Sequence, residues 1–385
     1  MTRPALLLIA LAIPAPARAQ HVVEIDYSTG RTIVDHEWRA MNSDDVIPDW
    51  DRGRLYVRDR EEPDGIMVFS LETGAHITTI RIPRGEGPFE IKDKWRRMAL
   101  ADDGGLHISG DRRVITYDPN YQPIRTWTPR APPSWAICDI GGKPAVPTTG
   151  GVLRHELETI GPRAIADTTR VIDKPGRSVG EAGALLHEAT GEMTLARLAC
   201  TDAMAILVKG YLRYQGENTM MSQGQPDSVF IYYRNGATDR VTVPNDYVDA
   251  DCKTTRTFAG RTVTLPCRPW NARLRPSFDE RGNLVLSTSH RDIAGAIIDL
   301  DTGCYTLVRK NPGTRDNILD ADADMHIRMI GVRGDSILTF HNDRGTAPDG
   351  KPTFFSNSAV KAALHPVRMV SGEPCAGMLA GDENG

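Results

Sequence analysis

Residues that could do chemistry are spread along this chain and do not form a recognised catalytic motif. The ten histidines include no H-E-x-x-H or H-x-H pair of the kind that binds zinc. No G-x-x-x-x-G-K-[ST] phosphate-binding loop is present either. These patterns predict no catalytic residue, no metal site and no cofactor.

One acidic segment invites comparison with calcium-binding loops. Asp320, Asp322 and Asp324 alternate with alanines, and hard cations prefer such carboxylate oxygens. An EF-hand loop that begins this way needs Gly at its sixth position and Glu at its twelfth. The chain has Met325 and Gly331 there, so we expect a solvated acidic loop.

A second set of polar and aromatic residues is placed more regularly, either after short apolar strands or in the connections between groups of strands. If they share one end of the fold, they suit ligand or protein recognition, in which aromatic residues and Arg are enriched. For Trp135 and Trp270, packing between sheets is the competing interpretation. The candidate ligand-binding residues are Arg60, Arg112, Trp135, Tyr211, Arg268, Trp270, His290, Arg291, His341 and Asp343.

The strands that must position these residues share one pattern, in which a turn with Gly or Asp precedes a short apolar strand with a polar end. Copies occur at 52–59, 103–111, 202–209, 281–287 and 333–341, and a weaker one at 141–148. Two of the strands are followed, nineteen residues after Leu55 and Leu284, by the glycines of similar turns, Gly74 and Gly303. Each turn lies between two β-rich runs, which predicts a hairpin.

Four short antiparallel strands in each of six repeated units describe an all-β fold, a six-bladed β-propeller of four-stranded antiparallel blades. A β-sandwich followed by a second β domain is the alternative. The recurring nineteen-residue spacing favours the propeller.

Three segments carry a family resemblance: 84–90 (RGEGPFE), 98–108 (MALADDGGLHI) and 113–118 (RVITYD). They resemble the NHL/TolB-like six-bladed β-propellers, which have a Gly-rich linker before a strand that follows a D-x-x-G turn. Here Phe89 follows Pro88 directly, so one Gly of the usual linker is absent. The resemblance covers 81–129 and recurs weakly over 275–309.

The chain ends have a role in such a ring. Ile25–Gly30 echoes Ile298–Gly303 in sequence. This segment could supply an outer strand to the last blade and close the ring. An edge hairpin separate from the ring is the alternative that the sequence leaves open.

Residues 1–19 have the three parts of an export signal. Arg3 supplies the positive charge, Ala5 to Ile13 form an apolar run, and Ala17 to Ala19 form a small-x-small cleavage site. The run is too short to cross a bilayer, which takes about 20 residues. We expect an exported protein, periplasmic or extracellular, whose residues 20–385 form one propeller domain, a monomer without a membrane span.

The six cysteines agree with an oxidising compartment, in which disulfides form. Their spacing leaves the pairing open. Cys252 and Cys267 stand fifteen apart across a polar stretch, which suits a staple across a hairpin.

Composition limits the function classes. Lys and Arg total 46 and Asp and Glu total 50, a net charge of −4, which argues against nucleic-acid binding because that requires a basic surface. The expected function is a module that binds a protein or a small-molecule ligand, not an enzyme. The alternative is a metal-dependent hydrolase or lyase at the mouth of the central channel, motivated by His290, His341 and Asp343 at the ends of neighbouring strands.

Export predicts a defined N-terminus. Cleavage after Ala19 should leave Gln20 as the first residue, because signal peptidase acts after the second small residue of this site. Intact-mass measurement of the exported protein checks this, with the same chain kept in the cytoplasm as the control. A folded, exported chain that retains Met1 would contradict the assignment.

Overall fold

The computed structural model consists of β-strands joined by turns, and the part that it describes contains no helix. The described residues are 21–37, 46–58, 65–92, 97–110, 113–129, 137–150, 154–160, 166–171, 177–178, 185–187, 192–201, 204–214, 220–221, 228–233, 238–241, 243, 253–258, 261–266, 270, 274–288, 290, 292–310, 328–342 and 359–372.

Three four-stranded antiparallel sheets follow one another in the first half of the chain. The first contains β3 (Val46–Asp49), β4 (Arg54–Arg58), β5 (Gly65–Ser70) and β6 (His76–Arg81). The second contains β7 (Arg97–Leu100), β8 (Leu106–Ser109), β9 (Val114–Tyr117) and β10 (Pro123–Trp127). The third contains β11 (Cys138–Asp139), β12 (Pro144–Gly150), β13 (Arg154–Ile160) and β14 (Ala166–Val171).

The second half is less regular. A seven-stranded sheet contains β15 (Arg177–Ser178), β16 (Leu185–His187), β17 (Glu192–Cys200), β18 (Met204–Tyr214), β19 (Met220–Met221), β20 (Ser228–Tyr233) and β21 (Thr238–Val241). A separate hairpin, β22 (Lys253–Phe258) and β23 (Arg261–Pro266), follows.

The last sheet has nine strands and joins both ends of the chain. It contains β24 (Arg275–Phe278), β25 (Leu284–Ser287), β26 (Ile293–Ile298) and β27 (Tyr305–Lys310). It continues through β1 (His21–Ile25) to β30 (Ala359–Gly372), β29 (Ser336–Asn342) and β28 (Arg328–Arg333), with β2 (Arg31–Glu37) paired to β30.

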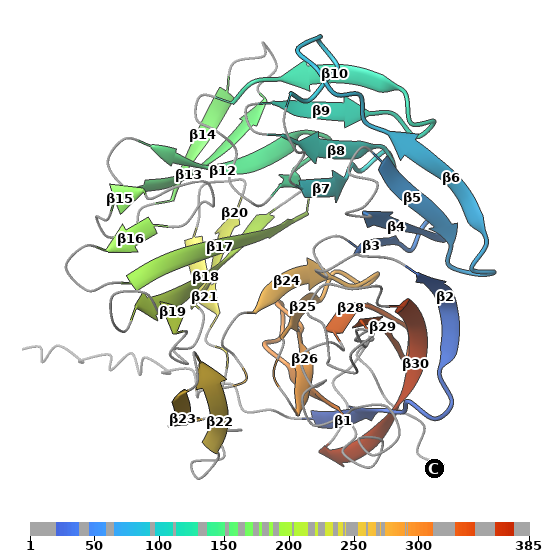
Figure 1. The fold of residues 1–385 in the computed structure, drawn as a ribbon, viewed down its shortest axis with the longest axis vertical. Coiled ribbons are helices and arrows are strands. Elements are labelled where there is room, and N and C mark those ends of the chain that lie inside the picture. The colour runs from blue at the N-terminus through green and yellow to red at the C-terminus, as the bar shows by residue number, and fades with distance from the viewer. Residues whose placement is uncertain are drawn as a thin grey trace, which may run out of the picture.

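The inner strands of successive sheets touch in chain order. β3 contacts β7, β7 contacts β11, β11 contacts β17, β17 contacts β24, β24 contacts β28, and β28 returns to β3. Figure 1 shows the sheets following one another around the molecule in the same order. Such a circuit of sheets is the arrangement of a β-propeller. The all-β, propeller-like fold expected from the sequence is therefore confirmed.

Asp-led turns connect consecutive strands of the nine-stranded sheet. Asp299 Oδ1 accepts N–H bonds from Asp301 (2.8 Å) and Thr302 (3.2 Å), and Gly303 follows at φ 70°. Asp26 likewise accepts hydrogen bonds from the hydroxyl (2.6 Å) and N–H (2.9 Å) of Ser28. The hydroxyl of Thr302 also donates to Asp299 Oδ2 (2.7 Å). Hydrogen bonds from the hydroxyls of Thr302 and Ser28, followed by those from backbone N–H groups, hold the pKa of both carboxyls below the usual value. The similar sequences Ile25–Gly30 and Ile298–Gly303 therefore both form a turn in which Asp accepts hydrogen bonds from the residues that follow it.

Apolar side chains pack between neighbouring sheets and make one sheet depend on the next. Ile66 and Val68 of β5 pack in the same cluster as Ile108 of β8 and Ile115 of β9, and all four are fully buried. Burial of each such side chain stabilises the fold by about 1.5–3 kcal/mol. A second cluster joins β18 and β20 to β25 and β26.

The two N-terminal strands close the ring. β2 pairs antiparallel with the first half of β30, from Glu37↔Ala359 to Arg31↔Leu364. β1 pairs antiparallel with the second half of β30 and in parallel with β27, so one sheet runs through both ends of the chain. The N-terminus supplies an outer strand, as the sequence indicated, and the separate edge hairpin is wrong.

Side chains hold β1 between its two neighbours. Val23 and Ile25 are fully buried, and His21 Nδ1 lies 3.0 Å from Thr306 Oγ1 on β27. Glu24 accepts a 2.7 Å hydrogen bond from Arg368 Nη2 on β30, and its other oxygen lies 3.8 Å from Arg309 Nη1 on β27. The buried carboxylate of Glu24 therefore bridges the two strands that flank β1.

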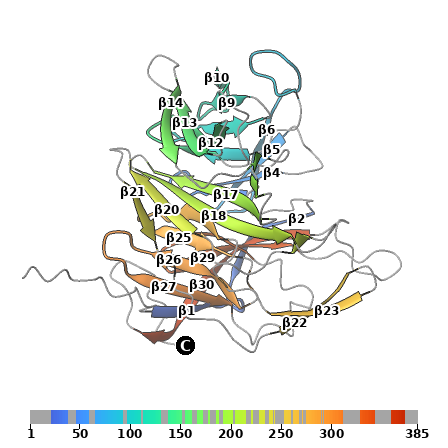
Figure 2. The same cartoon turned by 90° about the vertical axis from the view of Figure 1, so that its left-hand side faces the viewer.

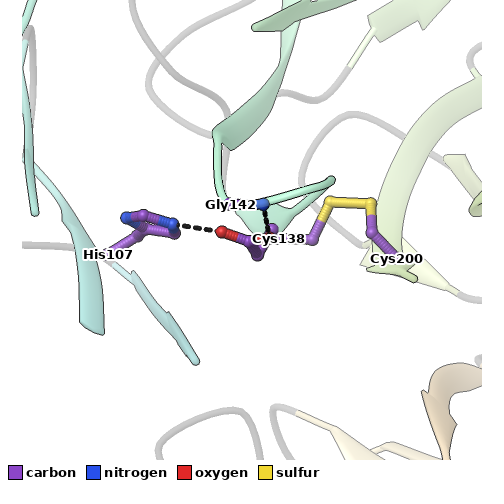
Figure 3. Close-up of a disulfide and its surroundings, with 5 residues drawn as sticks. His107, Cys138, Gly142 and Cys200 are labelled. Atoms are coloured by element: carbon purple, nitrogen blue, oxygen red, sulfur yellow. Dashed lines mark hydrogen bonds and ion pairs between the residues drawn. A yellow bond between two sulfur atoms is a disulfide. The ribbon is translucent and has the colours of Figure 1, made fainter. Parts of the chain in front are cut away.

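A second set of links converges on β11, which has only two residues. Cys138 forms a disulfide with Cys200 of β17, with Cα atoms 5.6 Å apart. His107 Nε2 of β8 donates to Asp139 Oδ2 (2.6 Å), and both side chains are buried. Figure 3 shows His107 and the disulfide on opposite sides of this strand. Each residue of β11 thus ties it to a different neighbouring sheet.

The other cysteines are only partly described. Cys304 is also disulfide-bonded. Cys252, Cys267 and Cys375 lie outside the described residues, so the staple expected between Cys252 and Cys267 stays a prediction.

Removal of β1 and β2 should unfold the ring. A variant that begins at Asp44 loses the buried side chains Val23, Ile25, Ile33 and Val34, a loss on the order of 6–12 kcal/mol, which equals the stability of a typical domain. Thermal melts should show no cooperative transition, while a variant that begins at Gln20 melts normally. An unchanged melting temperature would contradict closure by these strands.

The closure strands also predict a pH dependence. Burial lowers the pKa of His365 on β30 to about 4 and lowers that of His21. Because an unfolded histidine titrates near about 6.5, the unfolded state binds more protons between these values, and stability should fall as pH falls through this window, by about 2–3 kcal/mol for His365. Urea unfolding at about pH 7.5 and about pH 4.5 measures it.

His365→Asn, which cannot titrate, is the matched variant. It should lose less stability between the two pH values than the natural chain, whatever its stability at neutral pH. An equal loss in both proteins would exclude His365 as the group responsible.

Candidate functional site

The sheets have two different ends. In an antiparallel meander, the turns after the first and third strands share one end, while the connection after the second strand shares the other end with the link to the next sheet. The turn led by Asp299, between β26 and β27, lies at the first end. The second end, which we call the linker end, contains the segment 82–92 and the described residues Gly110, Arg113, Thr288, His290 and Asp292.

The linker 82–92 is held in one conformation by its own backbone. Gly85 N donates to Ile91 O (3.2 Å), and Ile91 N donates to Pro83 O (3.0 Å). Gly85 has φ 152°, and a Cβ there would lie 2.0 Å from Glu90 Oε2, so only glycine fits. The Gly-rich sequence therefore serves a sharp turn.

Arg113 fastens this linker to β9. Its Nη1 donates to the carbonyl oxygen of Glu90 (2.7 Å) and to that of Gly87. The N–H of Gly87 is itself satisfied by Glu90 Oε2 (2.8 Å). Because a carboxylate of the chain already accepts the hydrogen bond of this N–H, the loop is a linker turn and not an open phosphate cradle.

His290 lies at the same end, in the connection between β25 and β26. Its Nδ1 accepts hydrogen bonds from the N–H groups of Asp292 (3.1 Å) and Ile293 (3.2 Å). A ring nitrogen that accepts cannot carry the proton, so Nε2 is the protonated nitrogen of the neutral ring. Lys310, which is 8% exposed, donates from Nζ to the carbonyl oxygen of His290 (2.7 Å). The side chain of His290 and the ammonium group of Lys310 therefore both hold this loop by hydrogen bonds to its backbone.

His341 falls toward the same end of the nine-stranded sheet. It lies near the C-terminal end of β29, opposite Lys361. β29 and β25 run in the same direction, because the order β25-β26-β27-β1-β30-β29 contains four antiparallel pairs and one parallel pair. The structure thus places His290 and His341 at one end of that sheet. Their role in binding stays a prediction.

Trp270 has a different position from the rest of the candidate set. Its side chain is 1% exposed and packs in the cluster between β18, β20, β25 and β26. Its ring centroid is 6.3 Å from that of Tyr305, and its carbonyl oxygen accepts from Thr288 Oγ1 (2.8 Å). The side chain of Trp270 therefore packs between sheets, which was the competing interpretation of this residue.

The remaining candidates are only partly visible. Tyr211 lies on β18, opposite Thr194 of β17, toward the C-terminal end of the strand. Six candidates lie outside the described residues: Arg60, Arg112, Trp135, Arg268, Arg291 and Asp343. The acidic segment 320–324 lies outside them too.

Arg113 and Lys310, the two residues that fix the linker end, carry no motif that marks them in the sequence. Both are basic residues placed directly beside or within apolar strands, β9 and β27. Such a charge, at the border of a buried strand, normally needs a polar partner. That partner is a loop carbonyl oxygen in each case, which only the folded chain brings within reach.

The sequence also contains a serine motif that is not among the candidate residues. Gly176 to Gly180 reads GRSVG, a G-x-S-x-G pattern. A nucleophile elbow requires a turn between a strand and a helix. Here Ser178 lies on β15, in register with Leu185 of β16. The motif therefore lacks the context that would make its serine a nucleophile.

Within the described ranges, no three His, Cys, Asp or Glu side chains gather as a metal ion would require. In the same ranges, no helix is long and apolar enough to cross a membrane.

Comparison with other proteins adds little. No family model matches the sequence, and no curated protein matches it. Among solved structures, that of U3-55K is 10% identical, with a TM-score of 0.45 over 89% of this chain and 99% of that one. The WD40 repeats of RRP9 are 11% identical (TM-score 0.44, 90% and 100% covered), and the Neurospora crassa Pan2 WD40 domain is 8% identical (TM-score 0.39, 92% and 98% covered). Structural similarity at such low sequence identities and TM-scores supports no conclusion about function.

Proposed function

We propose that this chain is an exported, monomeric, six-bladed β-propeller of the NHL/TolB-like kind that binds a protein or a polar ligand at its linker end. The circuit of six inner strands supports six blades. In this interpretation β28, β29, β30 and β2 form the last blade, and the part of the seven-stranded sheet from β17 to β21 forms the fourth.

The observation that carries the binding role is the rigidity of the linker end. Arg113 and Lys310 each hold a connecting loop by donating to its carbonyl oxygens. Loops held by a scaffold keep their side chains in place before a partner arrives, which lowers the entropy cost of binding. The arginines of the candidate set add positive charge for an anionic or polar partner.

The double variant Arg291→Ala with His341→Ala tests this role. Chemical cross-linking of exported protein, followed by mass spectrometry, should identify a partner with the natural chain and lose it with the double variant. Because substitutions at exposed sites usually cost within about 0.5 kcal/mol, the melting temperature should hardly change. Arg125→Ala, on the exposed face of β10, is the matched control. Capture of the same partner by all three proteins would reject the linker end as the binding face.

The metal-dependent hydrolase or lyase stays as the second candidate because His290 and His341 lie at one end of the nine-stranded sheet. In His290, Nδ1 accepts hydrogen bonds from backbone N–H groups, so Nε2 carries the proton and would have to lose it before it could bind a metal. Metal analysis of the purified exported protein decides between the two functions. A stoichiometric metal lost in His290→Ala would favour the enzyme.

A further inference from the structure

The hairpin β22–β23 stands apart from the ring. The two strands pair with each other, from Lys253↔Pro266 to Phe258↔Arg261, and with no other strand that the structure describes. Figures 1 and 2 both show this hairpin outside the circuit of sheets. A two-stranded hairpin is marginally stable alone, and both of its edges present backbone groups for further pairing.

The register identifies which backbone groups face outward on β22. Pro266 has no N–H, so its pair with Lys253 suits a position without cross-strand hydrogen bonds. Antiparallel pairs alternate, so Thr255 and Thr257 occupy positions of the same kind. The N–H and C=O groups of these three residues on β22 therefore point away from β23. They form the edge to which another strand can add.

The hairpin carries a charge opposite to that of the whole chain. Between residues 253 and 266 there are three basic residues, Lys253, Arg256 and Arg261, and no acidic residue. The chain as a whole has a net charge of −4. Charge complementarity at an interface speeds association and discriminates between partners. A segment rich in Asp or Glu is the complementary partner for this hairpin.

We propose that β22–β23 is a docking arm that adds, along the outward edge of β22, an extended acidic segment of another protein. Backbone pairing supplies affinity in this mode of recognition, and side-chain charge supplies selectivity. A membrane surface or a nucleic acid would satisfy the charge but offers no strand to pair with the edge. The arm consists of other residues than the linker-end loops, and its role does not depend on the function proposed there.

Cys252 and Cys267 directly flank the two strands in the sequence. The staple predicted between them would limit fraying of an arm that has no sheet beside it. A disulfide acts in this way by removing conformations from the unstructured state.

A direct binding measurement tests the arm. The probe is a fluorescent twelve-residue peptide of alternating Val and Glu, added to the full exported chain and followed by fluorescence anisotropy. Arg256→Glu with Arg261→Glu should weaken binding by about tenfold or more, because two attractive charges become repulsive. Thr255→Pro should also weaken it by about tenfold, because it removes an outward N–H. Thr255→Val and Arg125→Glu, the matched controls, should stay within about twofold of the natural chain.

Several outcomes would overturn the proposal. They are no binding of the probe, equal binding by the charge-reversed variant, and equal binding of a peptide with Lys in place of Glu. Stronger arm-dependent binding to vesicles of anionic lipid than to the peptide would assign the arm to a membrane instead.

Two controls separate these outcomes from other causes. The melting temperature of each variant shows whether the ring remains folded, and the charge-reversed variant tests the arm even if Thr255→Pro disrupts the hairpin. Arg291→Ala with His341→Ala should bind the peptide normally. A loss there would place the peptide at the linker end and overturn the arm.

Discussion

Closure of the ring by β1 and β2 is the constraint on which the other sheets depend. Apolar side chains pack between neighbouring sheets, so a gap between two sheets would expose a face of each. The gap would fall between the last sheet and the first, because the chain ends there. Ile33 and Val34 fill it from the N-terminus, while Val23 and Ile25 pack between the strands of β25–β27 and those of β28–β30. The stability of the ring is therefore coupled to a short segment distant in sequence from the strands it joins.

The closure is specified by polar groups as well as by apolar burial. Glu24 lies between Arg309 of β27 and Arg368 of β30, and it is 8% exposed. A shift of β1 by one residue would turn Glu24 toward the opposite face of the sheet and leave the carboxylate without these partners. Truncation of either arginine is costly because the carboxylate of Glu24 stays buried with one partner fewer. The charges thus fix the register, while the apolar side chains provide most of the free energy.

Short strands elsewhere need similar support. β11 has two residues and contributes little ladder pairing, yet it belongs to the inner circuit between β7 and β17. The disulfide of Cys138 closes a loop of 62 residues, which on a chain-entropy argument is a contribution of about 4 kcal/mol. The hydrogen bond of Asp139 to His107 adds a buried polar link on the opposite side. A ring built this way presents a firm linker end, because Arg113 and Lys310 fasten connecting loops to strands that cannot shift independently.

Local patterns along the chain were sufficient for the all-β class, for turns such as Asp299–Gly303 and for the expectation that the N-terminus joins the last strands. Those features depend on near neighbours, since alternation of apolar residues and the hydrogen-bonding capacity of Asp and Gly act over a few positions. The sequence also defined the candidate residues at the strand ends. Tertiary structure alone decided that Trp270 packs between sheets, that Arg113 and Lys310 hold the linker end, and that Cys138 pairs with Cys200. Each of these contacts joins residues from distant parts of the chain. The spacing of residues in the sequence does not show which distant residues come close together in the fold.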